Sequence, residues 1–396
     1  MLSGTRTTVV AACALLAGLT APAGAQASET DSATIEAQTR IGSGYWDGQI
    51  SADGRFFVTT DDDQLIRHRL TRKSIKKAVH SKSSRALKKA EYSTTVLHPD
   101  GKFAYVFAHG FGRRWTIEIA RIDKSRPKFV RSYDFSAAGG ARSRLADAVI
   151  TPDGERLLLQ LRDDIVSLDL SRPGKPKVHA VLDGGLGDVP GIQAPLALSP
   201  DGSTLLTAVA DDGPLGTVRF AVWGSDDAGD LTLTGVRETM IDAEAETDSP
   251  PRLTEILTDA GSAYLQVEEA TDDAPVTSVV RVALEDGSKL STLPGAFKGS
   301  NEELAALDTA YDRVIGLRNR RWSGAEPPRD NELSLFWTDA ALGSISQDRR
   351  FARVTTTPVV SHAGPSKDKV YLTVRDGRRT RLLAVRLPSS PGANPS

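Results

Sequence analysis

A tight turn built around Asp-Gly recurs along the chain at nearly constant intervals. Its aspartates lie 47, 53, 48 and 58 residues apart. Proline presets φ at the first turn position, Asp bonds its own downstream backbone and Gly accepts positive φ, so each copy is a hairpin signal between two apolar runs. A repeat of about 50 residues with four short strands is typical of one blade of a β-propeller. The copies are Ala52-Asp53-Gly54, Pro99-Asp100-Gly101, Pro152-Asp153-Gly154, Pro200-Asp201-Gly202 and the degenerate Asp259-Ala260-Gly261.

The number of repeats predicts an all-β fold of seven four-stranded antiparallel blades, in a single domain over residues 28–387. The last repeat lacks a fourth strand, because the chain then enters Pro388-Ser389-Ser390-Pro391 and proline disfavours a strand. The spare segment 35–41 is therefore predicted to supply that strand and close the ring, which leaves residues 388–396 as a disordered tail. The first strands of successive blades are expected at residues 49–51, 94–97, 148–151, 196–199, 253–258, 304–307 and 358–361.

The N-terminus has the pattern of a Sec-type signal peptide over residues 1–27. Arg6 precedes a short apolar run at residues 9–19, and Ala25-Gln26-Ala27 offers small residues for cleavage. The run is too short to span a bilayer as a mature helix, and no second apolar run follows. We therefore expect a secreted, extracellular product without a transmembrane segment.

The only cysteine, Cys13, lies inside this leader. Val10-Ala11-Ala12-Cys13 matches a lipobox and leaves lipidation open, although the apolar run continues past Cys13. A chain cleaved after Ala27 has no thiol. That excludes disulfides, a cysteine nucleophile and thiolate-held metal or haem centres.

Charged residues recur where the inner strand of each blade is expected to begin, around the central channel. Loops on this face of a propeller usually carry the function. These residues could hold a cation or polarise a substrate, or they could cap strand ends and meet water. Calcium is thus left open, no metal ligand is assigned and no cofactor is predicted. The residues concerned are Asp47, Asp147, Arg252, Glu302 and Glu303.

Tryptophan beside arginine marks the outer loops of the same face. An exposed Trp can stack a planar ring, and a neighbouring Arg can hold an anion with two hydrogen bonds. The alternative is that each Trp covers a neighbouring blade. The candidate binding residues are Trp46, Arg113, Trp115, Arg321 and Trp322.

A basic stripe follows the first turn. Residues 64–90 contain ten Lys or Arg and no Asp or Glu, in a chain whose net charge is −2. Such a stripe on the outer half of the first blade would attract polyanions. Alternatively, the charges keep an outer strand from aggregating. The residues predicted to bind a polyanion are Lys73, Lys76, Lys77, Lys82, Lys88 and Lys89.

Catalytic motifs are missing from the sequence, which contains no Gly-x-Ser-x-Gly elbow, Walker loop or His-Glu-x-x-His. Among the six histidines, His98 replaces the Thr or Ser that precedes the turn in other repeats, and it is expected to be structural. His109 follows a predicted second strand and would open onto the channel face. It is the one candidate for an acid–base group.

The repeat resembles that of the YVTN-type and TolB-like bacterial β-propellers, whose repeats are WD40-like. The resemblance covers essentially the whole chain after the leader, and it implies the fold and the compartment. Such relatives include secreted lactonases, surface-layer and periplasmic binding proteins, and quinone- or haem-dependent dehydrogenases. The calcium-dependent lactonases use an Asn/Glu/Asp set in the channel, whereas only Asn301 of four asparagines is suitably placed here. The resemblance is carried by His98-Pro99-Asp100-Gly101-Lys102-Phe103-Ala104-Tyr105-Val106 and Leu198-Ser199-Pro200-Asp201-Gly202-Ser203-Thr204-Leu205-Leu206.

Two functions are consistent with these features. The first is a secreted, monomeric, non-catalytic propeller that binds a protein or an anionic cell-envelope polymer and no specific nucleic acid. It depends on the missing catalytic motifs and on the basic stripe. The alternative is a metal-dependent, lactonase-like hydrolase with its site at the central channel.

Overall fold

The computed structural model places the strands of the chain from residue 34 to residue 386. The predicted signal peptide and the predicted tail lie outside the described residues. No helix in the described part is long and apolar enough to cross a membrane. The described residues are 34–42, 48–51, 54–61, 63–71, 74–110, 115–134, 145–161, 164–186, 191–193, 196–211, 217–226, 230–241, 252–259, 261–269, 276–293, 300–308, 313–320, 331–339, 341–342, 345–354, 359–363, 369–376 and 379–386.

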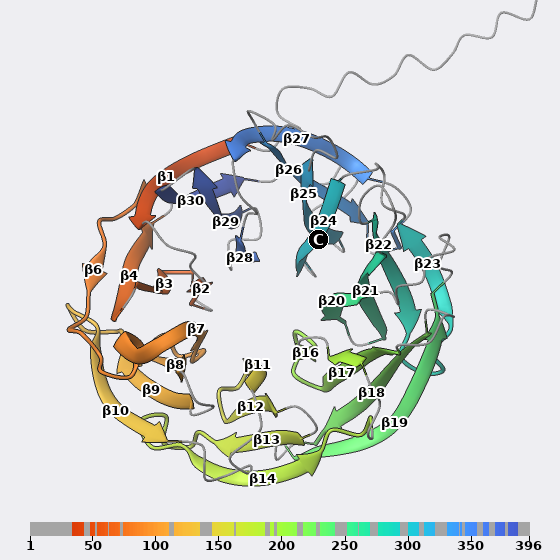
Figure 1. Cartoon of the computed structure of the whole chain (residues 1–396), viewed down its shortest axis with the longest axis horizontal. Coiled ribbons are helices and arrows are strands. Elements are labelled where there is room, and N and C mark those ends of the chain that lie inside the picture. Colours follow the sequence, from red (N-terminus) through yellow and green to blue (C-terminus); the bar gives the residue numbers. More distant parts are fainter. Residues whose placement is uncertain are drawn as a thin grey trace, which may run out of the picture.

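These residues form seven separate antiparallel sheets that surround a central opening (Figure 1). In each sheet the strands follow one another outward from the opening, and the next sheet begins again at the centre. The predicted all-β propeller is therefore confirmed, and the number of sheets fits the predicted blade count. We number the blades 1 to 7 in chain order.

Blades 1 to 4 occupy the first half of the ring. Blade 1 contains β2 (Gly48–Ile50), β3 (Phe56–Asp61), β4 (Gln64–Thr71) and two short outer strands, β5 (Ser74–Ile75) and β6 (Val79–His80). Blade 2 contains β7 (Ala90–Leu97), β8 (Phe103–Gly110), β9 (Trp115–Arg121) and β10 (Lys128–Asp134). Blade 3 contains β11 (Leu145–Ile150), β12 (Arg156–Leu161), β13 (Asp164–Asp169) and β14 (Lys177–Asp183). Blade 4 contains β15 (Gly191–Gln193), β16 (Ala197–Leu198), β17 (Thr204–Asp211), β18 (Thr217–Ser225) and β19 (Leu231–Met240).

Blades 5 to 7 complete the ring. Blade 5 contains β20 (Arg252–Thr258), β21 (Ser262–Glu269), β22 (Val276–Ala283) and β23 (Lys289–Leu293). Blade 6 contains β24 (Ser300–Asp308), β25 (Arg313–Arg320), β26 (Asn331–Asp339) and β27 (Ile345–Val354). Blade 7 contains β28 (Val359–Ala363), β29 (Lys369–Asp376), β30 (Arg379–Arg386) and, as its outer strand, β1 (Thr34–Gly42).

The outer strand of blade 7 comes from the N-terminal side of the chain, as predicted. β1 pairs antiparallel with β30, in a register that runs from Thr34 opposite Arg386 to Gly42 opposite Thr380. An ion pair of 2.6 Å between Glu36 and Arg386 lies on the same pair of strands. The spare segment thus closes the ring by giving the last blade its fourth strand.

Several inner strands differ from their predicted bounds. Among them, β7 and β11 begin three or four residues early, at Ala90 and Leu145. The inner strand of blade 4 is divided into β15 and β16, which both pair with β17. Pro195, which has no amide hydrogen to donate to a ladder, stands between them in the sequence. β24 extends from Ser300 to Asp308, a segment that contains no Gly or Pro, and so begins four residues ahead of its predicted start. Glu302 and Glu303 therefore lie within this strand instead of ahead of it.

Buried apolar side chains cluster between neighbouring blades. Between blades 1 and 2, Val58 and Leu65 pack with Val106 and Ile122, and all four are completely buried. Corresponding clusters join blades 2 and 3, 3 and 4, 4 and 5, 5 and 6, and 7 and 1. At these six boundaries the described blades bury apolar faces against each other, as expected for a repeat that has no core of its own.

The Asp-Gly turns also connect neighbouring blades. Gly154 and Gly202 have φ values of +79° and +77°, which other residues rarely adopt. A Cβ at Gly154 would lie 2.8 Å from Cε1 of His98, and one at Gly202 would lie 2.6 Å from Cδ of Pro152. Glycine is thus required at both turns for two reasons: the backbone has a positive φ, and the preceding blade approaches too closely for a Cβ.

Candidate functional site

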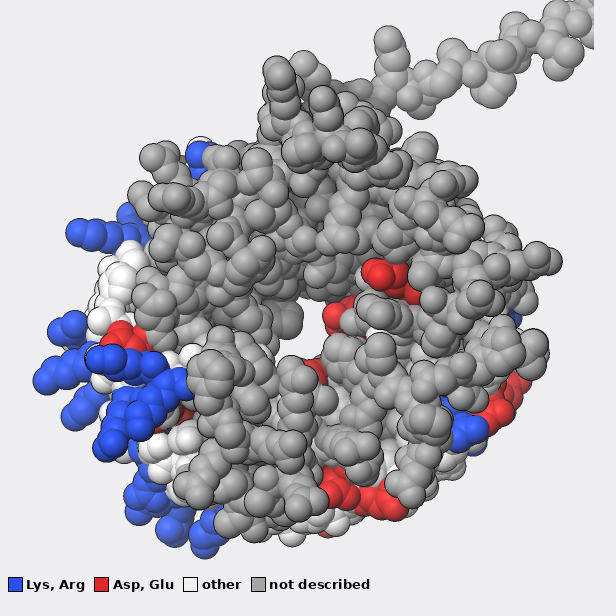
Figure 2. Space-filling view, viewed as in Figure 1, with Lys and Arg blue, Asp and Glu red and all other residues white. Residues whose placement is uncertain are grey.

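Acidic side chains lie around the central opening, shown in red in Figure 2. Among the predicted channel residues, Asp147 of β11 has described side-chain hydrogen bonds. Its carboxylate accepts hydrogen bonds from the N–H groups of Ala148, at 2.7 Å, and Leu196, at 2.9 Å. The second bond crosses from blade 3 to blade 4. Oδ2 of Asp147 thus joins blade 3 to blade 4, while Oδ1 bonds within its own strand. The predicted role of Asp147 in binding a ligand stays a prediction.

Other predicted residues of this face are placed by their backbone. Arg252 begins β20 and pairs with Glu268 of β21. His109, near the end of β8, is the cross-strand partner of Trp115 in β9. Trp115 was expected in a loop but begins a strand, so the structure brings these two candidates together. Asp47, Trp46, Arg113, Arg321, Trp322 and Lys73 lie outside the described residues.

Within the described part of the chain, no group of three or more His, Cys, Asp or Glu side chains is placed to hold a metal ion. The calcium ion allowed by the sequence therefore stays a prediction. It concerns the channel face, where Asp47 is not described and where Glu302 and Glu303 are placed only through the backbone of β24.

The basic stripe runs along the outer edge of blade 1. After β5 the chain returns along β4 as β6, which pairs with Ile66 and Arg67. It continues through residues 81–86 to a short 3-10 helix, η2 (Leu87–Lys89). We refer to residues 76–89 as the basic segment.

Every third residue from Ser81 to Leu87 of the basic segment is buried. Ser81, Ser84 and Leu87 are 0%, 6% and 2% exposed. Each of these buried residues is followed directly by an exposed base. The five described lysines of the predicted polyanion site are all exposed. The exposed bases of the segment are Lys76, Lys77, Lys82, Arg85, Lys88 and Lys89.

The buried residues hold the basic segment to the blade beneath it. Ser81 donates its N–H to the carbonyl of Leu65 at 2.8 Å, and its hydroxyl accepts the N–H of Leu65 at 2.9 Å. The N–H of Ser84 donates to the carbonyl of Asp63 at 2.7 Å. Leu87 packs into the apolar cluster between blades 1 and 2. The lysines are therefore presented by an anchored backbone.

The start of the basic segment is held by His68. Its Nδ1 lies 3.1 Å from the carbonyl oxygen of Lys76, which fits an N–H donor at this atom. Burial lowers the pKa of His68, an effect opposed by the bond to Lys76. A neutral ring is thus favoured beneath the charged segment.

Arg67 corrects the predicted composition of the stripe, because it is buried, with 8% of its surface exposed. Its guanidinium donates to the carbonyl oxygens of Ile122, Lys124 (2.6 Å) and Ser125 (3.3 Å), all in the connection between β9 and β10 of blade 2. It also lies over the ring of Phe56, 4.8 Å from the centroid. The side chain of Arg67 therefore joins blade 1 to blade 2 and is not part of the exposed surface. A count of charges along the sequence does not identify its partners in another blade.

A second arginine crosses the same boundary in the opposite direction. Arg126, from the β9–β10 connection, donates to the carbonyl of His80 at 2.6 Å and to that of Ser81 at 3.5 Å. Both carbonyls belong to the basic segment of blade 1. The two arginines thus fix the position of this segment relative to the outer part of blade 2.

Three described acidic residues lie near the basic segment. One of them, Asp63, is half-buried, and its carboxylate accepts a hydrogen bond from the hydroxyl of Ser83. The carboxylate of Asp123 accepts bonds of 3.0 and 2.7 Å from the guanidinium of Arg121, which lowers the pKa of Asp123. Glu118, in β9, is 6% exposed, and burial raises its pKa against the effect of hydrogen bonds with Ser132 and Ser84. The ionised form of Glu118 is thus disfavoured and Asp123 is balanced by its own partner. Glu118 therefore offsets little of the exposed positive charge, whereas Asp123 offsets part of it, because its Oδ2 also lies 3.8 Å from Nζ of Lys124.

Exposed bases continue from blade 1 onto blade 2. Figure 2 shows blue side chains gathered on the rim where Figure 1 places β4, β6 and β10. The bases of blade 2 were not predicted from the sequence. Lys124, Arg126 and Lys128 stand at every second position, a pattern that could have indicated an exposed basic edge. It is the contact with blade 1 that makes them part of one surface. We call this set the basic surface, and it consists of Lys76, Lys77, Lys82, Arg85, Lys88 and Lys89 of blade 1 and Lys124, Arg126, Lys128 and Arg131 of blade 2.

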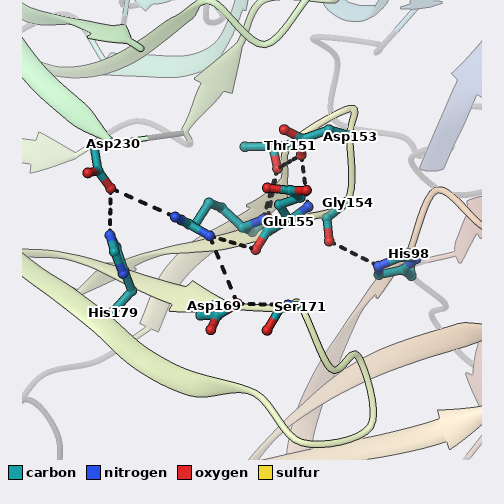
Figure 3. A network of polar contacts seen from close by, with 10 residues as sticks. His98, Thr151, Asp153, Gly154, Glu155, Asp169, Ser171, His179 and Asp230 are labelled. Atoms are coloured by element: carbon teal, nitrogen blue, oxygen red, sulfur yellow. Dashed lines mark hydrogen bonds and ion pairs between the residues drawn. The ribbon is translucent and has the colours of Figure 1, made fainter. Parts of the chain in front are cut away.

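His98 lies among the Asp-Gly turns, where it contacts the next blade (Figure 3). Its Nε2 lies 3.0 Å from the carbonyl oxygen of Gly154, and its Nδ1 accepts the N–H of Asp100 at 3.2 Å. Nδ1 also lies 2.9 Å from Oδ1 of Asp100, so the ring contacts both its own turn and the turn of the next blade. The structural role predicted for His98 is confirmed.

Figure 3 also shows a polar network between blades 3 and 4 that was not predicted. Asp230, just ahead of β19, lies 2.6 Å from Nε2 of His179 and 3.8 Å from the guanidinium of Arg156. The same guanidinium lies 3.9 Å from Asp169. These residues are far apart in the sequence and carry no motif. The observed contacts connect outer strands of neighbouring blades.

Comparison with known proteins supports the fold alone. No protein-family model matches the chain, and no curated protein matches it. The β-propeller domain of Swd1 from Myceliophteria thermophila is 11% identical, with a TM-score of 0.56 and coverage of 89% of this chain and 99% of that chain. The periplasmic gluconolactonase PpgL of Pseudomonas aeruginosa is 13% identical, with a TM-score of 0.54 and coverage of 87% and 88%.

A third similar structure, the WD40 repeats of RRP9, is 13% identical, with a TM-score of 0.52 and coverage of 90% of this chain and 100% of that chain. Because all three identities are low, the likeness concerns backbone architecture and transfers no ligand or reaction. The narrower resemblance to YVTN-type and TolB-like propellers still depends on the repeat sequence. The chain is therefore similar in fold to β-propellers, with WD40 domains and a lactonase propeller among them.

Proposed function

We propose that this protein is a secreted, non-catalytic β-propeller that binds an anionic polymer of the cell envelope through its basic surface. The observation that carries this proposal is the anchored basic segment. Its bases are exposed, while Ser81, Ser84 and Leu87 between them are buried. The alternative role, protection of an outer strand from aggregation, requires charged side chains but does not require that their backbone be held in place.

The electrostatics of the segment support the same function. Each exposed base is screened by salt, so a single surface contact contributes little. A polymer that meets several bases at once releases its condensed counterions, and the contacts then act together. Holding the backbone in place reduces the entropy lost on binding. A fixed row of lysines therefore suits a polyanion better than it suits a small anion.

A salt-dependent binding assay tests the proposal. The purified protein should be retained on immobilised polyphosphate at low salt and released as the salt concentration rises. A variant with Lys76, Lys77, Lys82, Lys88 and Lys89 changed to Gln should be released at lower salt, and its log–log salt dependence should flatten by up to about 3.5. Both proteins should melt at the same temperature, because these side chains are exposed.

A matched control uses exposed bases elsewhere on the ring. Changing Arg172, Lys175, Lys177 and Lys289 to Gln on blades 3 and 5 removes a similar charge, and should leave retention nearly unchanged. If the blade 1 variant and this control are released together, retention follows net charge and the proposed site is wrong.

The metal-dependent hydrolase remains the second candidate for the channel face. The likeness to a lactonase propeller concerns the fold alone, and no described residue cluster favours this function. Metal analysis of the purified protein separates the two functions. Stoichiometric calcium that a chelator removes would favour the hydrolase.

A further inference from the structure

We infer that the ligand of the basic surface is a linear polyanion that crosses from blade 1 to blade 2 along the rim of the ring. This inference rests on the proposed function and extends it, because it names the shape of the ligand and a second group of binding residues. The competing possibility is a compact anion bound by blade 1 alone.

The boundary between the two blades is firmly connected beneath the basic surface. Arg67 of blade 1 donates to Lys124 and Ser125, and Arg126 of blade 2 donates to His80 and Ser81. Each arginine thus binds the backbone that carries the other blade's exposed bases. A ligand that contacts both groups therefore meets a surface whose two halves are already fixed relative to each other.

The exposed bases of blade 2 lie on its outermost part. Lys124, in the β9–β10 connection, has 63% of its side chain exposed, and its Nζ lies 3.8 Å from the carboxylate of Asp123. Lys128 and Arg131 are exposed on β10, the outer strand of the blade. Arg131 also donates to the hydroxyl of Tyr133 at 2.9 Å, which steadies its guanidinium. Binding of a polyanion by these residues requires no rearrangement of the blade.

The shape of the surface favours a chain over a compact anion. The bases project outward along the rim in Figure 2, so a small anion would contact only those beside it. A long chain can follow the rim and meet both groups. The basic character weakens at blade 3. There the exposed bases Arg172, Lys175 and Lys177 are followed on β14 by Val178 and Val181, which are 48% and 49% exposed, and by the exposed acid Asp183. The path therefore covers two blades.

The test compares a short and a long polyanion on the same protein. Tripolyphosphate and long-chain polyphosphate are titrated at several salt concentrations, and the slope of log affinity against log salt is measured for each. Three variants are used: Lys82→Gln with Lys88→Gln and Lys89→Gln on blade 1, Lys124→Gln with Lys128→Gln and Arg131→Gln on blade 2, and Arg172→Gln with Lys175→Gln and Lys177→Gln as the control on blade 3. Arg126 is left unchanged because it holds the two blades together.

For the wild type, the slope should be steeper with the long chain than with tripolyphosphate. The blade 2 variant should lower the slope for the long chain by about 2, and should leave tripolyphosphate binding unchanged. The blade 1 variant should weaken both ligands, and the control neither. An unchanged slope of the blade 2 variant with the long chain would overturn the two-blade path while leaving the proposed function intact. Failure of the wild type to bind either polyphosphate would overturn both, as would preference for anionic lipid vesicles over the long chain.

Discussion

Replacement of Gly154 by alanine tests whether the Asp-Gly turns hold neighbouring blades together. A Cβ at this position would lie 2.8 Å from Cε1 and 2.9 Å from Nε2 of His98, so the imidazole must move. The positive φ of +79° at Gly154 costs an L-residue about 1–2 kcal/mol. Displacement of the ring weakens the contact of His98 with the carbonyl of Gly154, which contributes about 1 kcal/mol. We expect Gly154→Ala to lower the free energy of unfolding by roughly 2–3 kcal/mol.

The variant His98→Ala separates the two causes. In the His98→Ala variant the imidazole ring and its hydrogen bond to Gly154 are both absent. Gly154→Ala should then lower the free energy of unfolding only by the backbone strain, about 1–2 kcal/mol. The coupling between the two positions is then about 1 kcal/mol. Urea unfolding followed by circular dichroism, on the wild type, both single variants and the double variant, gives the four free energies. Equal costs of Gly154→Ala in the two backgrounds would refute the idea that this turn presses on the preceding blade.

Three further predictions concern stability. Arg67→Met removes the hydrogen bonds to the β9–β10 connection and should lower the free energy of unfolding, measured in urea, by roughly 2–4 kcal/mol. Arg69→Met, at an exposed position, should change it by less than about 0.5 kcal/mol. Equal effects of the two variants would mean that Arg67 does not join the blades. The raised pKa of Glu118 means that its protonated form contributes stability that is complete below the ordinary carboxyl pKa and is lost as the pH rises through the folded pKa. Glu118→Gln should therefore raise the thermal midpoint near pH about 8 and change it little near pH about 4, and a lower midpoint at the higher pH would contradict this. Deletion of residues 34–42 should lower the thermal midpoint and promote aggregation, because β30 becomes an open edge, while deletion of residues 388–396 should be nearly neutral; an unchanged midpoint after the first deletion would count against closure by β1.

The fold could be predicted because its signal is local and repeated. Each Asp-Gly turn defines its own conformation through neighbours in the sequence, as the positive φ of Gly154 and Gly202 shows. The closing strand could be inferred because one blade lacked a strand and one segment lacked a partner. Even the inner strand of blade 4 departs from its expected bounds beside a proline, a residue with a known local effect.

The composition of the candidate site could be predicted only in part, because it depends on contacts between blades. The exposed lysines of the basic segment were found by counting charge, and five of the six are described and exposed. The same count wrongly included Arg67, whose hydrogen-bond acceptors belong to blade 2. It also passed over Lys124 and Lys128, which join the surface because Arg67, Arg126 and an apolar cluster hold blade 2 against blade 1. Charge along a sequence indicates a kind of ligand, whereas the extent of a surface is decided by which segments meet in space.

The pairing of β1 with β30 has a consequence for the order in which the molecule is assembled. Residues 34–42 leave the ribosome early, but their partner, residues 379–386, is made only after every other strand. The first strand must therefore wait, unpaired, through the synthesis of the whole ring. A contact of such long sequence separation has a large loop-closure cost and is expected to slow folding. During that interval the chain is an open arc with an exposed edge at either end, a form to which chaperones can bind until the last strand has been made.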